Sequence, residues 1–118
     1  MEFISEKLSQ YIENHSEDEP SLLKELNRET WSKVLQPRML SGHYQGRLLS
    51  LISKLVRPKS ILEIGTYTGY SALCLAEGLV ADGMLHTIDY NEELFGFQKK
   101  YINRSPFKNQ IKQYVGEA

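Results

Sequence analysis

Apolar residues recur at helical spacing from Ile4 to Val56. Their three stripes, separated by polar breaks, predict three helices; the members are Ile4, Leu8, Tyr11 and Ile12, then Leu22, Leu23, Leu26, Trp31, Val34 and Leu35, then Leu48, Leu49, Ile52, Leu55 and Val56. In the first break, Ser16 and Glu19 have the spacing of a capping box for the second helix. We expect that helix to stop near Pro37, a loop over 36–42, and a third helix from His43 to just before Pro58.

The pattern changes after Pro58. Residues 60–64 are a short β-branched run ended by Gly65, which predicts a strand buried on both faces. A helix with its apolar face over 72–80, a strand over 84–89, a helix capped by Asn91 and a strand over 110–115 follow. This β-α-β-α-β order predicts an α/β fold with parallel strands, right-handed crossovers and helices on both faces of the sheet. We divide the chain into a helical segment, 1–58, and the first part of a parallel-sheet domain, 59–118.

Size and charge restrict the possible functions. The chain has 118 residues, enough for one domain, and its 14 Lys and Arg against 15 Asp and Glu give no electrostatic reason to expect nucleic acid or an anionic membrane as partner. No apolar run approaches the ~18 residues of a membrane span, and no secretory signal is visible, so we expect a cytoplasmic protein. Cys74 is the only cysteine and is expected to be a small buried residue.

A parallel sheet of three strands is small. Its first strand would keep one open side unless further strands or another subunit covered it. We therefore expect the chain to be about half of a domain.

The turn after the first strand has the features of a ligand site. Gly65 lies where the strand passes into the helix, and glycine there lets the backbone approach a ligand closely. Gly69 opens the helix, whose free N–H groups, with the Ser71 hydroxyl, can face an anion. Asp89, at the end of the second strand, can accept hydrogen bonds from both hydroxyls of a ribose. These features predict a ligand that contains a ribose.

Three nucleoside ligands compete for this layout: ATP in a P-loop, a dinucleotide such as NAD, and S-adenosylmethionine. A P-loop needs a lysine after its glycine, and no lysine lies between Lys59 and Lys99. The dinucleotide fingerprint needs glycine at two positions that Tyr67 and Tyr70 occupy. S-adenosylmethionine needs less clearance and would accept Glu63 as partner for its ammonium group. It is the favoured ligand, with NAD as the alternative.

These residues resemble a known family. The stretch 62–73, LEIGTYTGYSAL, together with Thr87-Ile88-Asp89 and the final Gly-Glu-Ala, is similar to class I S-adenosylmethionine-dependent O-methyltransferases of the caffeoyl-CoA and catechol type. Residues 39–46 resemble the segment that precedes the last N-terminal helix in that family. Tyr67 departs from the middle glycine of the general motif, although a bulky residue there is usual in this subgroup. The resemblance covers about residues 36–118 and implies a Rossmann-like sheet, truncated here after the third strand.

The resemblance implies a set of cofactor-binding residues: Ser41, Glu63, Gly65, Thr66, Tyr67, Gly69, Ser71, Asp89, Tyr90 and Ala118. Glu63 and Ser71 would hold the amino and carboxylate ends of the methionine moiety, and Gly65 and Thr66 would form the floor beneath it. Ser41 would contact the cofactor from above.

On the adenosine side, the resemblance implies that Tyr67 packs beside the sulfonium, Asp89 binds the ribose, and Tyr90 and Ala118 flank the adenine. Structural explanations compete with these roles. Asp89 could cap the following helix, Glu63 could be a strand carboxylate satisfied by N–H groups, and the glycines could be turn residues. For Ser41 and Tyr90, loop or packing roles are the alternatives.

In the family the sheet continues and the chain is about twice this long. The resemblance implies that the acids that bind a divalent cation such as Mg²⁺, and the residues that orient the acceptor, lie in that other half; the catalytic residues are unknown, and no metal ligand is expected in this chain. We expect a parent enzyme, commonly a homodimer, that methylates a hydroxyl of a small aromatic acceptor, and little or no turnover by this polypeptide alone. A nonenzymatic Rossmann-like nucleotide-binding or dimerisation module is the alternative.

Overall fold

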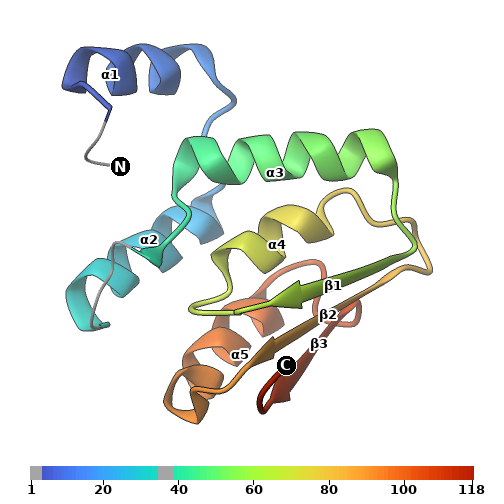
Figure 1. Cartoon of the computed structure of the whole chain (residues 1–118). Coiled ribbons are helices and arrows are strands. Elements are labelled where there is room, and N and C mark those ends of the chain that lie inside the picture. Colours follow the sequence, from blue (N-terminus) through green and yellow to red (C-terminus); the bar gives the residue numbers. More distant parts are fainter. Residues whose placement is uncertain (1–3, 35–38) are drawn as a thin grey trace.

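The computed structural model describes residues 4–34 and 39–118, in which helices precede an alternating β/α region (Figure 1). The elements are α1 (Glu6–His15), α2 (Ser21–Lys33), α3 (His43–Val56), β1 (Ser60–Ile64), α4 (Tyr70–Ala76), β2 (Met84–Asp89), the 3₁₀ helix η2 (Glu92–Leu94), α5 (Phe95–Arg104) and β3 (Ile111–Val115). The expectations for Leu35 and for a stop at Pro37 lie outside the described residues. No helix within the described ranges is long and apolar enough to cross a membrane.

The three N-terminal helices are confirmed, but the capping box is wrong. Helix α2 begins after Pro20 and has no side-chain cap, while Ser16 is the C-cap residue that follows α1. The carboxylate of Glu19 instead accepts a hydrogen bond from the hydroxyl of Tyr70 in α4. A long-range partner therefore replaces the local one that the sequence suggested.

The three strands form one parallel sheet in the order β1-β2-β3. Ile61 of β1 pairs with Leu85 of β2, which in turn pairs with Ile111 of β3. The predicted β-α-β-α-β order and parallel pairing are confirmed. Parallel register brings the carboxyl ends of all three strands to the same edge of the sheet.

Helices α4 and α5 cover the same face of the sheet. Glu63, Thr87 and Gln113 share one register row. Glu63 hydrogen-bonds Ser71 of α4, and Gln113 hydrogen-bonds Gln98 of α5. The prediction of helices on both faces is wrong for the described elements, because two right-handed crossovers that advance in one direction put both helices on one side.

The opposite face of β1 is open. Leu62 is 71% exposed and Ile64 67% exposed, so the prediction of a strand buried on both faces is also wrong for this chain. The strand's composition is that of a fully covered strand, but β1 is an edge strand of this sheet. The expectation of an open side on the first strand is confirmed.

The core lies between the sheet, α2, α4 and α5. Its buried apolar members include Leu26, Leu73, Leu85 and Tyr101. Cys74 is fully buried, and burial raises the pKa of its thiol to about 12, which confirms the prediction of a small buried residue.

Candidate functional site

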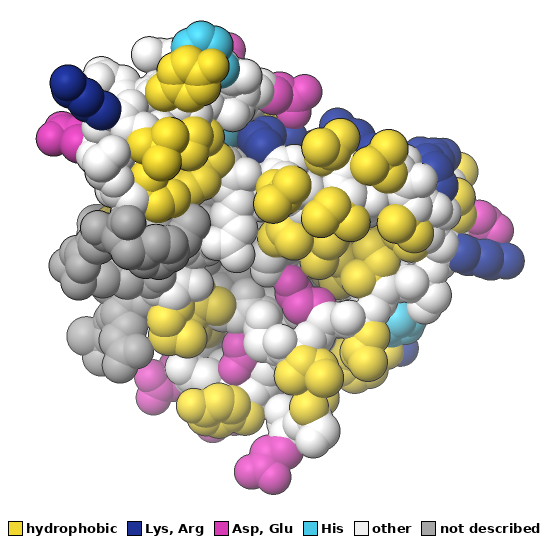
Figure 2. Space-filling view, turned by 45° about the horizontal axis from the view of Figure 1, so that its top comes forward, with side chains coloured by type: hydrophobic (Ala, Val, Ile, Leu, Met, Phe, Trp, Pro, Cys, Tyr) yellow, Lys and Arg dark blue, Asp and Glu magenta, His cyan; other side chains and the backbone are white. Residues whose placement is uncertain are grey.

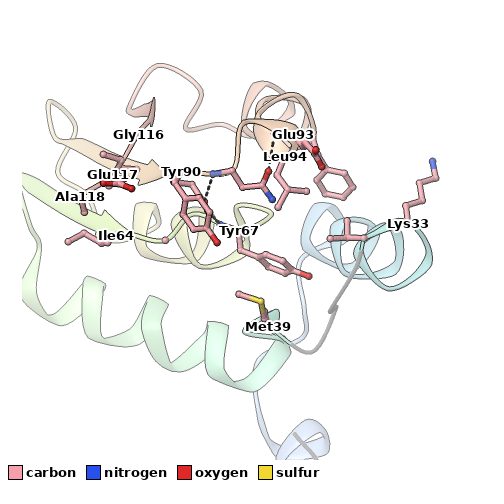
Figure 3. A pocket seen from close by; sticks show the side chains of 16 residues that line it. Lys33, Met39, Ile64, Tyr67, Tyr90, Glu93, Leu94, Gly116, Glu117 and Ala118 are labelled. Atoms are coloured by element: carbon pink, nitrogen blue, oxygen red, sulfur yellow. Dashed lines mark hydrogen bonds between the residues drawn. The ribbon is translucent and has the colours of Figure 1, made fainter.

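A cavity of about 920 Å³ opens at the carboxyl edge of the sheet (Figure 3). The ends of the three strands and the turns that follow them supply Ile64, Gly65, Tyr67, Ile88, Asp89, Tyr90, Asn91, Gly116, Glu117 and Ala118, and the helical side supplies Lys33, Val34, Met39, Glu93, Leu94 and Phe97. Tyr90 and Ala118 lie toward one end of the cavity, Lys33 lies at the other, and Tyr67 lies between them (Figure 3). This is the place where parallel α/β sheets bind ligands.

The turn between β1 and α4 contains three residues in the left-handed region. Gly65 has φ +96° and Gly69 +95°, as the two glycines predict, and Tyr67 between them has φ +52°. A Cβ added to Gly65 would meet no atom within 4 Å, so no other group covers the main chain on that side. For a bulky residue such as Tyr67, the left-handed conformation costs about 1–2 kcal/mol.

Hydrogen bonds on both sides of Tyr67 hold this conformation. Its N–H donates to Oδ2 of Asp89 at 2.8 Å, and its carbonyl oxygen accepts from Nε2 of Gln98 at 2.6 Å. The turn is therefore tied to the end of β2 and to α5.

The carboxylate of Asp89 lines the cavity and accepts main-chain hydrogen bonds there. Its second oxygen, Oδ1, accepts from the N–H of Asn91 at 3.0 Å. Each carboxylate oxygen can accept a further hydrogen bond, because one N–H occupies only one of its lone-pair sites. The side chain that caps η2 is that of Asn91, which accepts from Glu93 N–H at 3.1 Å, so helix capping does not by itself account for Asp89.

A partly buried polar network lies beneath the turn. Ser71 donates to Oε2 of Glu63 at 2.5 Å, and Thr87 donates to Oε1 at 2.7 Å. The hydroxyls of Thr87 and Thr66 are 2.6 Å apart. Burial raises the pKa of the Glu63 carboxyl, the bonds from Ser71 and Thr87 oppose this rise, and the negative charge of Asp89 adds to it. A nearby cation would favour the ionised form of Glu63.

The structure separates the expected site residues into groups. Gly65, Tyr67, Asp89, Tyr90 and Ala118 line the cavity. The network of Glu63, Thr66, Ser71 and Thr87 lies behind them on the helical side of the sheet, and Gly69 is the N-cap of α4. Ser41, in the loop before α3, is half-buried and does not line the cavity.

Several residues of the site were not anticipated. Thr87 could have been found from the period of a strand, because it shares a face with Glu63 in the register. Val34 and Phe97 come from the end of α2 and from α5, and no local motif marks them. Only the packing of these helices over the strand ends brings them to the cavity.

No metal-ligand cluster of three or more His, Cys, Asp or Glu side chains exists within residues 4–34 and 39–118. The three histidines hydrogen-bond to separate partners: His15 to the carbonyl of Tyr11, His43 to that of Glu17, and His86 to the hydroxyl of Tyr114.

Known proteins resemble this chain in sequence and in fold. A sequence model described as O-methyltransferase matches residues 13–118. A caffeoyl-CoA O-methyltransferase from Stellaria longipes is 34% identical over 116 residues, which are 97% of this chain and 48% of that protein. One from Arabidopsis thaliana is 35% identical over 97% of this chain and 44% of its own length.

Among solved structures, an SAH-bound methyltransferase from Podospora anserina has a TM-score of 0.86 at 27% identity, covering 95% of this chain and 48% of the other. An O-methyltransferase from Bacillus cereus in complex with SAH has a TM-score of 0.85 at 27% identity, covering 93% and 50%. The chain thus spans about half the length of the curated relatives it matches. Since the sequence model covers most of its residues, the chain belongs to the O-methyltransferase family.

Proposed function

We propose that this chain supplies the S-adenosylmethionine-binding part of an O-methyltransferase that methylates a hydroxyl of a small acceptor. The observation that carries the proposal is the position of Asp89, whose carboxylate is held on the cavity by the N–H groups of Tyr67 and Asn91. The SAH bound in the two structural neighbours supports the choice of ligand.

The residues at the cavity fit this cofactor. Asp89 would accept both ribose hydroxyls, and the bare main chain at Gly65 leaves room beside it. Tyr90 is 80% exposed, so its ring is available to an adenine, with Ala118 as the other flank. The cavity volume lies within the range of small-molecule sites, roughly 300–1,000 Å³. S-adenosylmethionine, when bound, would supply the methyl group on its sulfonium.

The network behind the turn would hold the amino-acid end. A ligand ammonium would favour the ionised form of the Glu63 carboxyl, because an opposite charge stabilises the charged form. Ser71 has one hydroxyl proton, which it gives to Glu63 in this structure. An ammonium that takes over that carboxylate oxygen would free Ser71 to donate to the ligand carboxylate, while Tyr67 would pack beside the sulfonium.

The acceptor class rests on the relatives' names, which specify caffeoyl-CoA. We propose a hydroxylated, aromatic small molecule as acceptor. The described part of the chain does not offer a ligand set for Mg²⁺.

Calorimetry with SAH and with NAD tests the cofactor proposal. We expect binding of SAH, and we expect Asp89→Ala to weaken it by about 1–3 kcal/mol, because the ligand loses a charged hydrogen-bond acceptor. Asp82→Ala is the matched control, since that side chain is 78% exposed in the turn before β2. Binding of NAD alone, or an unchanged affinity of Asp89→Ala for SAH, would contradict the proposal.

The open face of β1 and the outer side of α3 favour a second property, association with another polypeptide. Exposed apolar residues gather on α3 (Figure 2), including Leu48, Leu51 and Leu55, and Leu62 and Ile64 add to them on β1. Since an exposed apolar face invites association, we expect the 118-residue chain to self-associate with rising concentration, and Leu62→Lys to reduce this self-association. Analytical ultracentrifugation measures it, and a monomer at all concentrations would contradict it.

A further inference from the structure

Gln98 lies outside the cavity lining but is bonded to the turn that forms part of it. The side chain comes from α5 and is 2% exposed. Its Nε2 donates to the carbonyl oxygen of Tyr67 at 2.6 Å, and its Oε1 accepts from Nε2 of Gln113 at 2.9 Å. Gln113 also donates to the carbonyl of Phe95 at 3.4 Å. Two glutamines from α5 and β3 therefore form a chain that ends on the main chain of Tyr67.

The Tyr67 backbone needs such support. Tyr67 has the left-handed conformation that glycine adopts freely and a bulky residue does not, so other conformations compete with it. With φ at +52°, its N–H reaches Asp89 while its carbonyl faces Gln98. Strained residues persist where the surrounding structure holds them in place. Here the hydrogen bonds of the Tyr67 N–H to Asp89 and of the Tyr67 carbonyl to Gln98 do so.

We infer that Gln98 is a positioning residue for the cofactor site, acting through the main chain of Tyr67; this rests on the proposed function. By holding the carbonyl of Tyr67, Gln98 keeps the N–H of Tyr67 hydrogen-bonded to Oδ2 of Asp89. Gln98 thereby orients the carboxylate that binds the ribose. A variant without this bond populates the competent turn less, and apparent affinity falls in proportion to that population.

A double-mutant cycle tests the inference. The variants are Gln98→Met, which conserves volume and removes the donor, Tyr67→Gly, which removes the conformational strain, and the two combined. Gln110→Met is the matched control, because Gln110 also donates to main-chain carbonyls, those of Val80 at 3.0 Å and Gly83 at 3.1 Å, but at the opposite end of the sheet. SAH affinity is measured by calorimetry and the denaturation midpoint by circular dichroism.

We expect Gln98→Met to weaken SAH binding roughly tenfold, the effect of one lost hydrogen bond to a strained backbone. Gln110→Met should stay within about twofold, because its bonds are far from the cavity. In the background that carries Tyr67→Gly, removing Gln98 should change affinity by less than about threefold, since glycine needs no support for this conformation.

An equal loss in both backgrounds, or wild-type affinity for Gln98→Met, would overturn the inference. If Gln98→Met does not fold, the inference requires the combined variant to fold, because glycine at position 67 needs no support from Gln98. A combined variant that also fails to fold would overturn the inference. If the wild-type chain binds no SAH, the proposed function fails, and the midpoints of the same four proteins still test the coupling between residues 67 and 98.

Discussion

Gly78→Ala is expected to destabilise the protein by about 3 kcal/mol, because a Cβ there would come closer to other atoms than a Cβ at any other glycine of the chain. Gly78 follows α4 and packs against the end of α3. A Cβ at this position would overlap the main-chain carbon of Ser53 and lie 2.5 Å from the nitrogen of Lys54. Backbone atoms inside a helix cannot move aside as a flexible side chain can. Ser53 also donates to the carbonyl of Leu75 at 2.5 Å, so the clash would separate the two helices at a bonded contact.

Urea denaturation measures this loss, and Gly96→Ala is its control. Gly96 lies in α5, is exposed, and an added Cβ there would meet nothing within 4 Å. The control should gain about 0.5–1 kcal/mol, because alanine has the higher helix propensity. A Gly78→Ala protein within about 1 kcal/mol of the wild type would show that the contact between α3 and α4 yields easily.

Arg47→Met is expected to cost about 3 kcal/mol, the second large effect. The Arg47 side chain is 8% exposed and joins α3 to the loop before α2 and to the turn after α4, with Nη1 at 2.7 Å from Glu17 and Nη2 at 2.5 Å from Glu77. Glu77, only 18% exposed, would keep its charge without its main partner. Breaking a buried ion pair from one side leaves such an uncompensated charge, which costs more than the pair itself contributes. Replacing both partners by apolar residues, Arg47→Met with Glu77→Leu, should recover part of the loss.

The cost of Arg47→Met should depend on pH. Burial tends to raise the pKa of Glu77, but the hydrogen bonds from Arg47 and Ser50 and the charge of Arg47 lower it overall. A depressed folded pKa contributes stability above the ordinary pKa of glutamate, and this contribution is lost as pH falls through the folded pKa. In the Arg47→Met variant, Arg47 no longer lowers the pKa of Glu77, so the rise caused by burial is less opposed. The gap in unfolding free energy between wild type and variant should therefore be wider at about pH 7 than near pH 4, and equal gaps would contradict this account.

The elements of the fold were largely predictable from local patterns. The bounds of β1 and β2 match the prediction, because Gly65 and the polar residues after Asp89 mark where the strands end and Gly83 marks where β2 begins. The cap of η2 by Asn91 was predicted for the same local reason. The capping box at Ser16 was not found, because Glu19 binds Tyr70, a residue 51 positions away that no local rule can locate.

The candidate site was predictable in part. The positive φ angles of Gly65 and Gly69 follow from glycine being the residue that adopts them without strain. The conformation of Tyr67 could not be read in this way, because a tyrosine there gives no local sign of a left-handed backbone. Its support by Asp89 and Gln98 required β2 and α5 to be in place.

The order and type of the elements, the parallel pairing that follows from β-α-β alternation, and the glycine turn at the end of β1 could all be predicted from the amino-acid sequence. These depend on interactions between residues near one another in the chain. The folded structure was needed to show that α4 and α5 share one face, that the other face of β1 is open, and that helical residues complete the cavity. Those features depend on the direction in which the crossovers advance and on side chains that meet only after the helices pack on the sheet.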